Sequence, residues 1–95
     1  MTAWVYMLAS KPYETLYTGV TTDLARRIYE HREGLIEGFS ERYGVKSLVW
    51  YEGHSELMLA IGREKRIKRW RRKWKFELVE QMNPDWRDLY PDFNR

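Results

Sequence analysis

Residues 3–21, AWVYMLASKPYETLYTGVT, decide the fold of this 95-residue chain. Residues 3–9 and 15–21 are rich in aromatic and β-branched side chains, a composition typical of strands. Pro12 fixes the φ angle of the turn between them. We therefore expect an antiparallel hairpin at the start of the chain. Its second strand contains Gly19, which weakens a strand unless another group must approach the backbone closely there.

Capping residues, glycines and a proline divide the rest of the chain into further elements. We expect a first helix from a cap at Thr22 or Asp23 to about Glu33, followed by a polar loop at 34–45 with a helical turn near 40–43. A strand at 46–52 comes next. A second helix then runs from a cap at Ser55 to about Trp70, and a third runs from Arg71 to about Gln81, where Asn83-Pro84 ends it.

These elements predict a single α/β domain over residues 1–95, with a three-stranded, mostly antiparallel sheet flanked by helices. Residues 82–95 form a C-terminal tail that contains Trp86, Leu89 and Phe93. A free tail is rarely this apolar, so we expect it to pack back onto the domain.

The composition excludes several classes of protein. Hydrophobic residues make up 43% of the chain and aromatic residues 16%, which argues for a compact fold rather than a disordered one. There is no cysteine, so disulfides and thiolate zinc sites are excluded. No apolar run approaches the length of a membrane span, and we see no secretory signal pattern. We therefore expect a soluble, cytoplasmic protein with no membrane partner.

The positive charge is concentrated in residues 63–75 (REKRIKRWRRKWK), which contain nine Lys/Arg and one Glu in a chain of net charge +3. A patch of this kind attracts the phosphate backbone of nucleic acids. Trp70 and Trp74 lie four residues apart within it, and we expect them to form core or groove wall rather than stacking platforms for bases. The residues predicted to bind nucleic acid are Arg63, Lys65, Arg66, Lys68, Arg69, Arg71, Arg72 and Lys73.

Two polar residues occur on the inward side of the first predicted helix. Leu24 and Ile28 define that side, and the helical period places Arg27 and His31 on it or at its edge, close to each other. An arginine there is costly unless its guanidinium meets a carboxylate, a carbonyl or a bound phosphate. The pattern therefore indicates either a structural ion pair or a phosphate-binding role for Arg27.

The second predicted helix has a carboxylate on its apolar side. Leu57, Ala60, Ile61 and Ile67 form the apolar stripe, and Glu64 lies on it. Such a residue should be paired with a cation or hold a metal. One carboxylate can hold Mg²⁺ or Mn²⁺ when waters and a substrate phosphate supply the other oxygens. A salt bridge to a nearby basic residue explains the position equally well.

Tyr6 and Tyr17 lie eleven residues apart on the two strands of the predicted hairpin. Strand tyrosines are mostly packing residues. A tyrosine has an ordinary pKa near 10 and acts as a base near neutral pH only where positive charge lowers that pKa. Arg27 and the basic segment could supply the charge. Together, these residues predict one polar pocket in a basic, aromatic-rich domain.

The chain resembles the GIY-YIG nuclease superfamily, in particular its small single-domain bacterial branch. The first family motif is similar to Trp4-Val5-Tyr6 and the second to Tyr17-Thr18-Gly19. Further similarities lie in Thr22 to Arg27 with His31, in Arg63-Glu64-Lys65, in Asn83-Pro84-Asp85-Trp86, and in the segments 38–43 and 48–52. The spacing of the two tyrosine motifs, with Arg27 and Glu64 in register, makes the resemblance specific.

The resemblance implies a GIY-YIG-like fold that hydrolyses a phosphodiester with one divalent ion, Mg²⁺ or Mn²⁺. Tyr17 would be the general base, and Tyr6 would orient the site by hydrogen bonding. Arg27 would stabilise charge on the phosphoryl oxygens in the transition state.

The resemblance implies supporting roles as well. Glu64 would hold the metal ion, and His31 would position groups or relay a proton. Gly19 and Asn83 would support the pocket, while the basic segment would follow the nucleic-acid backbone.

The leading hypothesis is therefore a metal-dependent endonuclease that acts on DNA rather than RNA, on single-stranded, branched or damaged strands as in DNA repair. The first alternative is a non-catalytic nucleic-acid-binding module that uses residues 63–75. A third is a protein-interaction domain with a tryptophan-rich face, which salt-insensitive behaviour toward nucleic acids would favour. Protein partners and oligomeric state are left open by the sequence.

Overall fold

A three-stranded antiparallel sheet forms the centre of the protein. The computed structural model describes residues 2–35 and 44–92. The strands are β1 (Ala3–Ala9), β2 (Leu16–Thr21) and β3 (Ser47–His54), in the spatial order β2-β1-β3. The hairpin and the α/β architecture predicted from the sequence are confirmed, and β2 is an edge strand whose outer side no other strand of the described chain covers.

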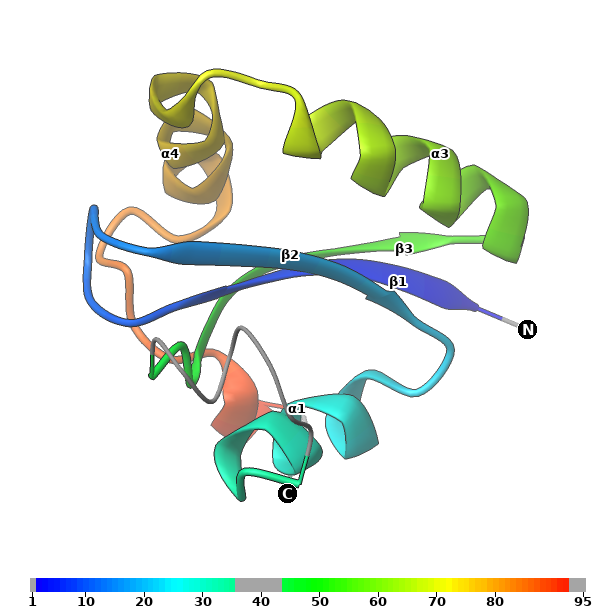
Figure 1. Ribbon diagram of the computed structural model, residues 1–95, viewed down its shortest axis with the longest axis horizontal. Coiled ribbons are helices and arrows are strands. Elements are labelled where there is room, and N and C mark those ends of the chain that lie inside the picture. Colours follow the sequence, from blue (N-terminus) through cyan, green and yellow to red (C-terminus); the bar gives the residue numbers. More distant parts are fainter. Residues whose placement is uncertain (1, 36–43, 93–95) are drawn as a thin grey trace.

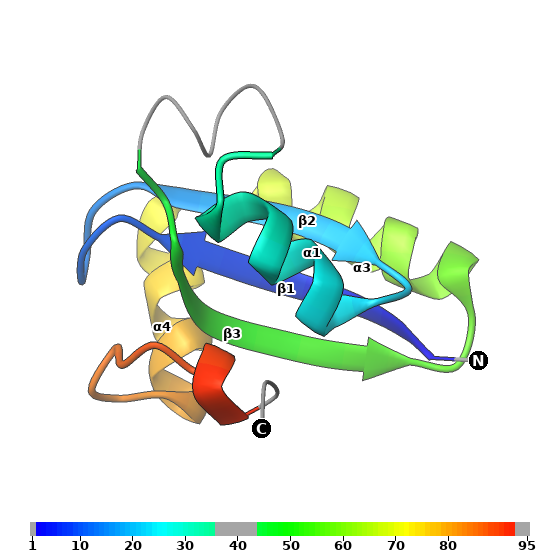
Figure 2. The same ribbon diagram turned by 90° about the horizontal axis from the view of Figure 1, so that it is seen from below.

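Helices cover both faces of the sheet. Helices α3 (Leu57–Lys68) and α4 (Arg72–Met82) lie on one face, and α1 (Leu24–Arg32) lies on the other (Figure 1). A short 3-10 helix (Tyr90–Asp92) lies on the same side as α1, next to β3 (Figure 2). The sheet therefore separates a region next to α1 from a region next to α3 and α4. Strand β2 forms one edge of both regions.

Side chains of the central strand alternate between two hydrophobic cores, as the period of two residues in a strand requires. The core on the side of α3 and α4 includes Val5, Met7, Ile67 and Val79. The core on the side of α1 includes Tyr6, Leu8, Leu24 and Ile28. Because Tyr6 and Tyr17 face α1 while α3 covers the opposite face, groups on the two sides can meet only around the edge of β2.

The ends of the helices test the capping predictions. Asp23 caps α1, with its carboxylate accepting a hydrogen bond from the Arg26 backbone N–H at 3.2 Å. Gly34 follows the helix with φ +68°, where a residue without a Cβ is favoured. The predicted cap at Ser55 is wrong, since α3 begins after Glu56, whose side chain makes no capping hydrogen bond. The helical turn expected near 40–43 lies outside the described residues.

Buried side chains and one carboxylate attach the C-terminal segment to the domain. Trp86 and Leu89 are buried. The carboxylate of Asp88 accepts hydrogen bonds from the backbone N–H groups of Leu48 and Tyr90, and it pairs with the guanidinium of Arg32. Arg32 and Asp88 are far apart in the sequence, so this pairing is visible only in the fold.

Candidate active site

Tyr6 is held against the backbone of Gly19. The two residues are direct partners in the β1–β2 ladder, and the Tyr6 side chain is fully buried. A Cβ added at Gly19 would lie 2.5 Å from the Tyr6 hydroxyl oxygen and 2.6 Å from its Cζ. Glycine is therefore the residue that lets the phenol lie across β2, which accounts for its presence in a strand interior.

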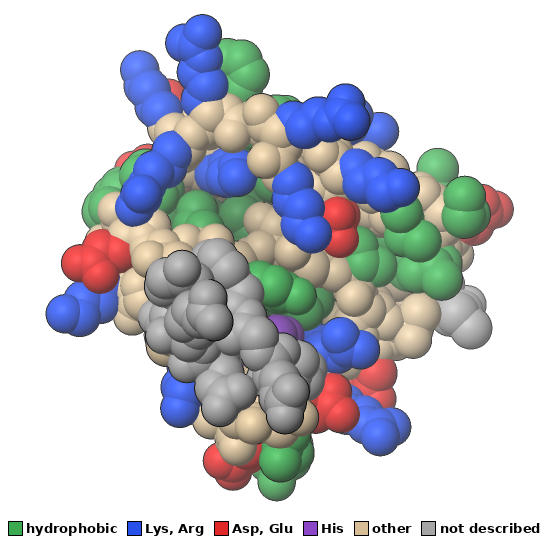
Figure 3. All heavy atoms as spheres, in the orientation of Figure 1, with side chains coloured by type: hydrophobic (Ala, Val, Ile, Leu, Met, Phe, Trp, Pro, Cys, Tyr) green, Lys and Arg blue, Asp and Glu red, His purple; other side chains and the backbone are tan. Residues whose placement is uncertain are grey.

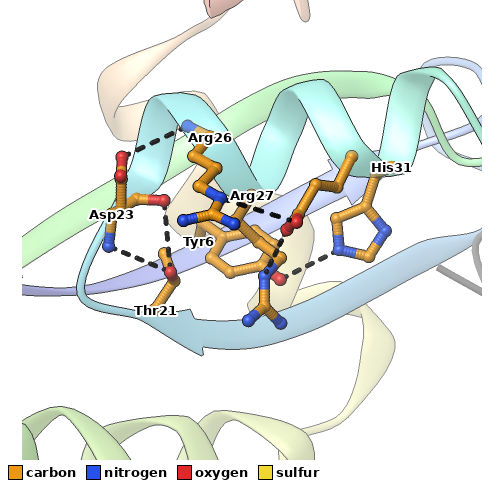
Figure 4. A network of polar contacts seen from close by, with 7 residues as sticks. Tyr6, Thr21, Asp23, Arg26, Arg27 and His31 are labelled. Carbon is orange, nitrogen blue, oxygen red and sulfur yellow. Dashed lines mark hydrogen bonds and ion pairs between the residues drawn. The ribbon is translucent and has the colours of Figure 1, made fainter. Parts of the chain in front are cut away.

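The hydroxyl of Tyr6 reaches His31 on α1. The Tyr6 oxygen lies 3.1 Å from His31 Nε2, within hydrogen-bonding distance, and both side chains are buried. The Tyr17 ring packs beside both, with centroids 6.2 Å from Tyr6 and 5.2 Å from His31. Tyr6, His31 and Arg27 point toward one another between α1 and the sheet (Figure 4). We call Tyr6, Tyr17, Arg27 and His31 the tyrosine cluster.

Burial sets the protonation states in this cluster. Desolvation, followed by the proximity of Tyr17, raises the pKa of Tyr6 well above its ordinary value near 10, although the Arg27 charge acts in the opposite direction. Desolvation and then the Arg27 charge lower the pKa of His31, against a smaller opposing effect of Glu30. Near neutral pH, Tyr6 therefore keeps its proton and His31 is uncharged.

Arg27 lies at the exposed side of the tyrosine cluster. Its Nε is 3.4 Å from the Glu30 carboxylate, one turn along α1, and its side chain is 40% exposed. An ion pair as open as this contributes little to stability. Next to it is a hollow of about 230 Å³ lined by Thr21, Thr22, Asp23, Arg26, Arg27 and Glu30. The structural ion pair expected for Arg27 is therefore present, and the guanidinium is also partly open to solvent. A phosphate-binding role for Arg27 stays a prediction.

Glu64 lies on the other side of the sheet, on α3. Its side chain is only 17% exposed, and its carboxylate is 3.4 Å from the Lys68 ammonium one turn later. The predicted apolar stripe is confirmed at Ala60 and Ile67, which are buried, but it is wrong at Leu57, which is 43% exposed. The first turn of α3 lies at the end of the sheet rather than over its centre (Figure 1).

A metal ion would find one protein carboxylate here. Among the described residues, there is no group of three or more His, Cys, Asp or Glu side chains that could hold a metal ion. A single partly buried carboxylate does not fit a resident ion in an all-protein cage. It fits a hard divalent cation that completes its shell with waters and phosphate oxygens, the way Mg²⁺ usually binds.

The residues of the basic segment 63–75 differ in whether they already contact a partner in the fold. Arg63 donates to both carboxylate oxygens of Glu52, at 3.0 and 3.4 Å, and its guanidinium lies 5.3 Å from the Trp70 ring centroid. It is therefore already neutralised. Trp70 and Trp74 meet edge to face at 6.4 Å, Trp74 is 49% exposed, and both rings form part of the wall of one hollow.

The remaining predicted phosphate ligands lie on the surface. Lys and Arg side chains gather over α3 and α4 in Figure 3. Two of them have aromatic neighbours: the guanidinium of Arg71 lies over Trp74, and that of Arg72 lies over Phe76 while it donates to the Tyr13 carbonyl at 3.1 Å. Exposed members of the set are Lys65, Arg66, Lys68, Arg69, Arg71, Arg72 and Lys73.

Asn83 has a structural role that its bonds define. Its buried amide nitrogen donates to the carbonyls of Val49 at 3.1 Å and Arg87 at 2.8 Å, and its oxygen accepts from the Arg87 N–H at 3.1 Å. These bonds connect the end of α4 to β3 and to the C-terminal segment. Asn83 therefore supports the frame of the domain, and the contacts of its side chain do not reach the tyrosine cluster.

A family comparison recognises most of the chain. The GIY-YIG catalytic domain matches residues 2–77, which span the tyrosine cluster and Glu64. In addition, none of the helices in residues 2–35 and 44–92 combines the length and the apolar character needed to cross a bilayer.

Related proteins share the length of the domain. The UPF0213 protein of Citrobacter koseri is 36% identical over 81 residues, 85% of this chain and 81% of its own. UPF0213 protein YhbQ of Escherichia coli is 32% identical over the same number of residues, with the same coverage. The solution NMR structure of a UPF0213 protein from Bacillus halodurans aligns with a TM-score of 0.58 and 30% identity over 90% of each chain. None of these names states an activity.

Proposed function

Because this chain belongs to the GIY-YIG family, we propose that it is a metal-dependent endonuclease that hydrolyses phosphodiester bonds of DNA. The family is one of nucleases, which implies a nucleic-acid substrate. The observation that carries the proposal is the tyrosine cluster, in which Gly19 lets Tyr6 bond to His31 beside Tyr17 and Arg27. If these positions only filled the hydrophobic core, apolar side chains would do so without burying polar groups.

We assign the two tyrosines different tasks from their surroundings. Tyr6 keeps its proton because burial raises its pKa, so it can only donate or accept hydrogen bonds. Tyr17 is partly exposed and its residue lines a surface hollow, so it is the more accessible of the two tyrosines. Tyr17 is therefore the general base of the proposal, taking a proton from the attacking water directly or through a second water.

Arg27 and His31 serve the same step from α1. The guanidinium of Arg27 would face the phosphoryl oxygens and stabilise the charge that develops on them. His31 is neutral and hydrogen-bonded to Tyr6, which makes it a positioning residue for that phenol. A neutral imidazole leaves Arg27 as the cation of the cluster, so the positive charge is directed at the phosphate.

Glu64 is the proposed metal ligand. Nucleases of this family generally use a divalent metal, and Mg²⁺ or Mn²⁺ fits a single carboxylate shared with a substrate phosphate. Such an ion, when bound, supplies Lewis-acid stabilisation of the leaving oxygen. The Lys68 ammonium, 3.4 Å from the Glu64 carboxylate, is the group that a divalent cation would displace there.

The arrangement also favours a second function, a nucleic-acid-binding module without catalysis. Glu64 already has Lys68 as a partner, and it lies across the sheet from the tyrosine cluster. The basic surface over α3 and α4 would suffice for binding. We rank it second because it gives no reason for a buried Tyr6–His31 hydrogen bond.

Cleavage assays test the proposal. Labelled single-stranded, duplex and branched DNA, together with RNA, would be incubated with Mg²⁺ or Mn²⁺ and with EDTA. Wild type would be compared with Glu64→Gln and with the control Glu56→Gln, which removes an exposed carboxylate at the start of the same helix. Circular dichroism and thermal unfolding would verify that each variant folds.

We expect metal-dependent cleavage of DNA that Glu64→Gln abolishes and Glu56→Gln retains. Cleavage that is equal in all three proteins would indicate a contaminant. Absence of cleavage on every substrate, with tight and salt-sensitive binding by wild type and Glu64→Gln alike, would replace the nuclease by the binding module.

A further inference from the structure

Two lysines meet next to Tyr17 at the edge of the sheet. A surface hollow of about 230 Å³ is lined by Leu16, Tyr17, Thr18, Lys68 and Lys75. Lys68 is the last residue of α3, and Lys75 lies in the first turns of α4. The corner between the two helices therefore brings both ammonium groups to the outer side of β2.

The contacts of the two lysines keep them together. The Lys75 ammonium donates to the Lys68 carbonyl at 3.4 Å, while the Lys68 ammonium pairs with Glu64 at 3.4 Å. The Lys68 side chain is 52% exposed, so it remains open to a ligand. Within the described residues, no carboxylate forms an ion pair with Lys75, which leaves that charge without a counterion.

Such a pair is electrostatically unfavourable without an anion. Desolvation and then the Lys68 charge lower the pKa of Lys75, as expected where two ammonium groups lie close together. An anion placed between the two ammonium groups would relieve the repulsion and use both charges.

The hollow is part of a longer surface along β2. A second hollow of about 350 Å³ shares Leu16 and Lys75 with it and continues past Arg72 and Trp70 toward the β1–β2 turn. In the opposite direction β2 leads to the hollow beside Arg27. Tyr17 thus lies on an edge strand with basic side chains on both sides of it. A polyanion laid along this edge would meet repeated positive charges.

A larger hollow beside α4 is a weaker candidate. It measures about 500 Å³ and lies between Trp70, Trp74 and the second half of α4. Its basic residue, Arg63, is already paired with Glu52 through two hydrogen bonds. An anion would have to break that pair, whereas Lys75 has no such partner to lose.

We propose that Lys68 and Lys75 bind a backbone phosphate of the nucleic-acid strand, next to the phosphate attacked at Tyr17. This contact sets the path of the strand along the edge of β2. The inference rests on the proposed function for the identity of its ligand, a polynucleotide. It concerns binding and not bond cleavage, so it can be tested without metal and without turnover.

Lys75→Gln is the informative variant, because Lys75 lies outside the proposed catalytic groups. Lys46→Gln is the control, as it removes an exposed lysine just before β3 that lies outside the predicted nucleic-acid-binding set. Lys75→Arg keeps the charge. Binding of a short fluorescent single-stranded DNA would be measured by anisotropy in EDTA at several salt concentrations. Amide chemical shifts of Tyr17 and Thr18 would be followed by NMR during the titration.

We expect Lys75→Gln to weaken binding several-fold and to reduce the slope of log K against log salt by about 0.7, the value for one phosphate contact on a single strand. The shifts of Tyr17 and Thr18 seen with wild type should be lost in Lys75→Gln and kept in Lys75→Arg and Lys46→Gln. Equal shifts in wild type and a folded Lys75→Gln would overturn the inference.

The two proposals fail separately. Binding with these signatures but no cleavage under any metal would leave the lysine site standing and refute the nuclease. Metal-dependent cleavage by wild type, with the Tyr17 and Thr18 shifts unchanged in Lys75→Gln, would leave the nuclease standing and refute the lysine site.

Discussion

The two sides of strand β2 differ in how their polar groups are held. On the α1 side, Tyr6 and His31 are buried, mutually hydrogen-bonded and fixed by contact with Gly19. On the α3 side, Glu64 and Lys68 form an ion pair on one helix, with Lys68 half exposed. The first region fixes protonation states by packing. The second leaves the Lys68 ammonium half exposed. Under the proposed function, the first region would supply catalytic groups and the second would contact the ligand.

The largest effect that tests this division concerns the two tyrosines. Tyr17→Phe should lower the cleavage rate by about 10²–10⁴-fold, the usual contribution of a general base. Tyr6→Phe keeps the ring but loses the bond to His31, so we expect a smaller loss of rate together with a loss of stability. Single-turnover cleavage and urea unfolding would measure the two quantities.

The two variants control each other, because each removes one hydroxyl from the same cluster. If Tyr6→Phe lost more rate than Tyr17→Phe while remaining folded, the assignment of the base would be reversed. If neither changed the rate, the cluster would be structural and the comparison between the two sides of β2 would lose its chemical meaning.

The next effect is on stability, at Gly19. Gly19→Ala should destabilise the fold by about 1–3 kcal/mol, because the new methyl group would overlap the phenol of Tyr6. Tyr6→Leu removes the phenol ring, so Gly19→Ala should cost much less in that background. A double-mutant cycle by urea unfolding gives the coupling. Equal costs in both backgrounds would show that strand geometry, and not Tyr6, requires the glycine.

Gly19 also shows how much could be predicted from the sequence. A glycine inside a strand pattern predicted a close approach to the backbone, and Tyr6 makes that approach. Periodicity likewise placed Arg27 and His31 together on α1, because both lie on one helix where spacing fixes direction. Local rules were therefore sufficient wherever the partners belong to the hairpin or to one helix.

Tertiary contacts account for what the sequence could not predict. Sequence spacing cannot tell which face of a sheet a helix covers, so it could not show that Arg27 on α1 and Glu64 on α3 belong to helices on opposite faces. Their convergence with Tyr17 on one pocket stays a prediction. Nor could it pair Arg63 with Glu52 on a strand eleven residues earlier. Lys75 looked like one more basic residue, and only the corner between α3 and α4 brings it beside Tyr17.

The pH dependence of the free energy of unfolding should report on the buried His31 of the α1 side. Its pKa is lowered in the folded state, so the unfolded chain binds a proton below pH 6.5 while the native protein does not. The free energy of unfolding should therefore fall as the pH falls through 6.5 toward the lower native pKa, with a slope of at most about 1.4 kcal/mol per pH unit.

Urea unfolding of wild type and His31→Gln between pH 7.5 and pH 5 would measure this contribution, and His54→Gln is the control for the second histidine of the chain. The fall should be reduced in His31→Gln and retained in His54→Gln. An identical pH profile for wild type and His31→Gln would mean that the imidazole is not held neutral in the native state.

The smallest effect divides the basic segment itself. Arg63 and Lys65 lie two residues apart in the sequence. Arg63 is bound to Glu52, whereas Lys65 is exposed. Arg63→Gln should lower stability by up to about 1 kcal/mol and leave the salt dependence of DNA binding unchanged. Lys65→Gln should leave stability unchanged and reduce the salt slope by up to about 0.7.

Anisotropy titrations at several salt concentrations, with thermal unfolding of the same samples, would decide between these outcomes. An equal reduction of the salt slope in both variants would mean that Glu52 releases Arg63 when nucleic acid binds. The Arg63 guanidinium would then leave Glu52 and bind a phosphate, as we propose for Lys68 and Glu64. Unequal slopes would show instead that a partner chosen by the fold, rather than position in a basic run, decides which arginines and lysines meet the phosphates.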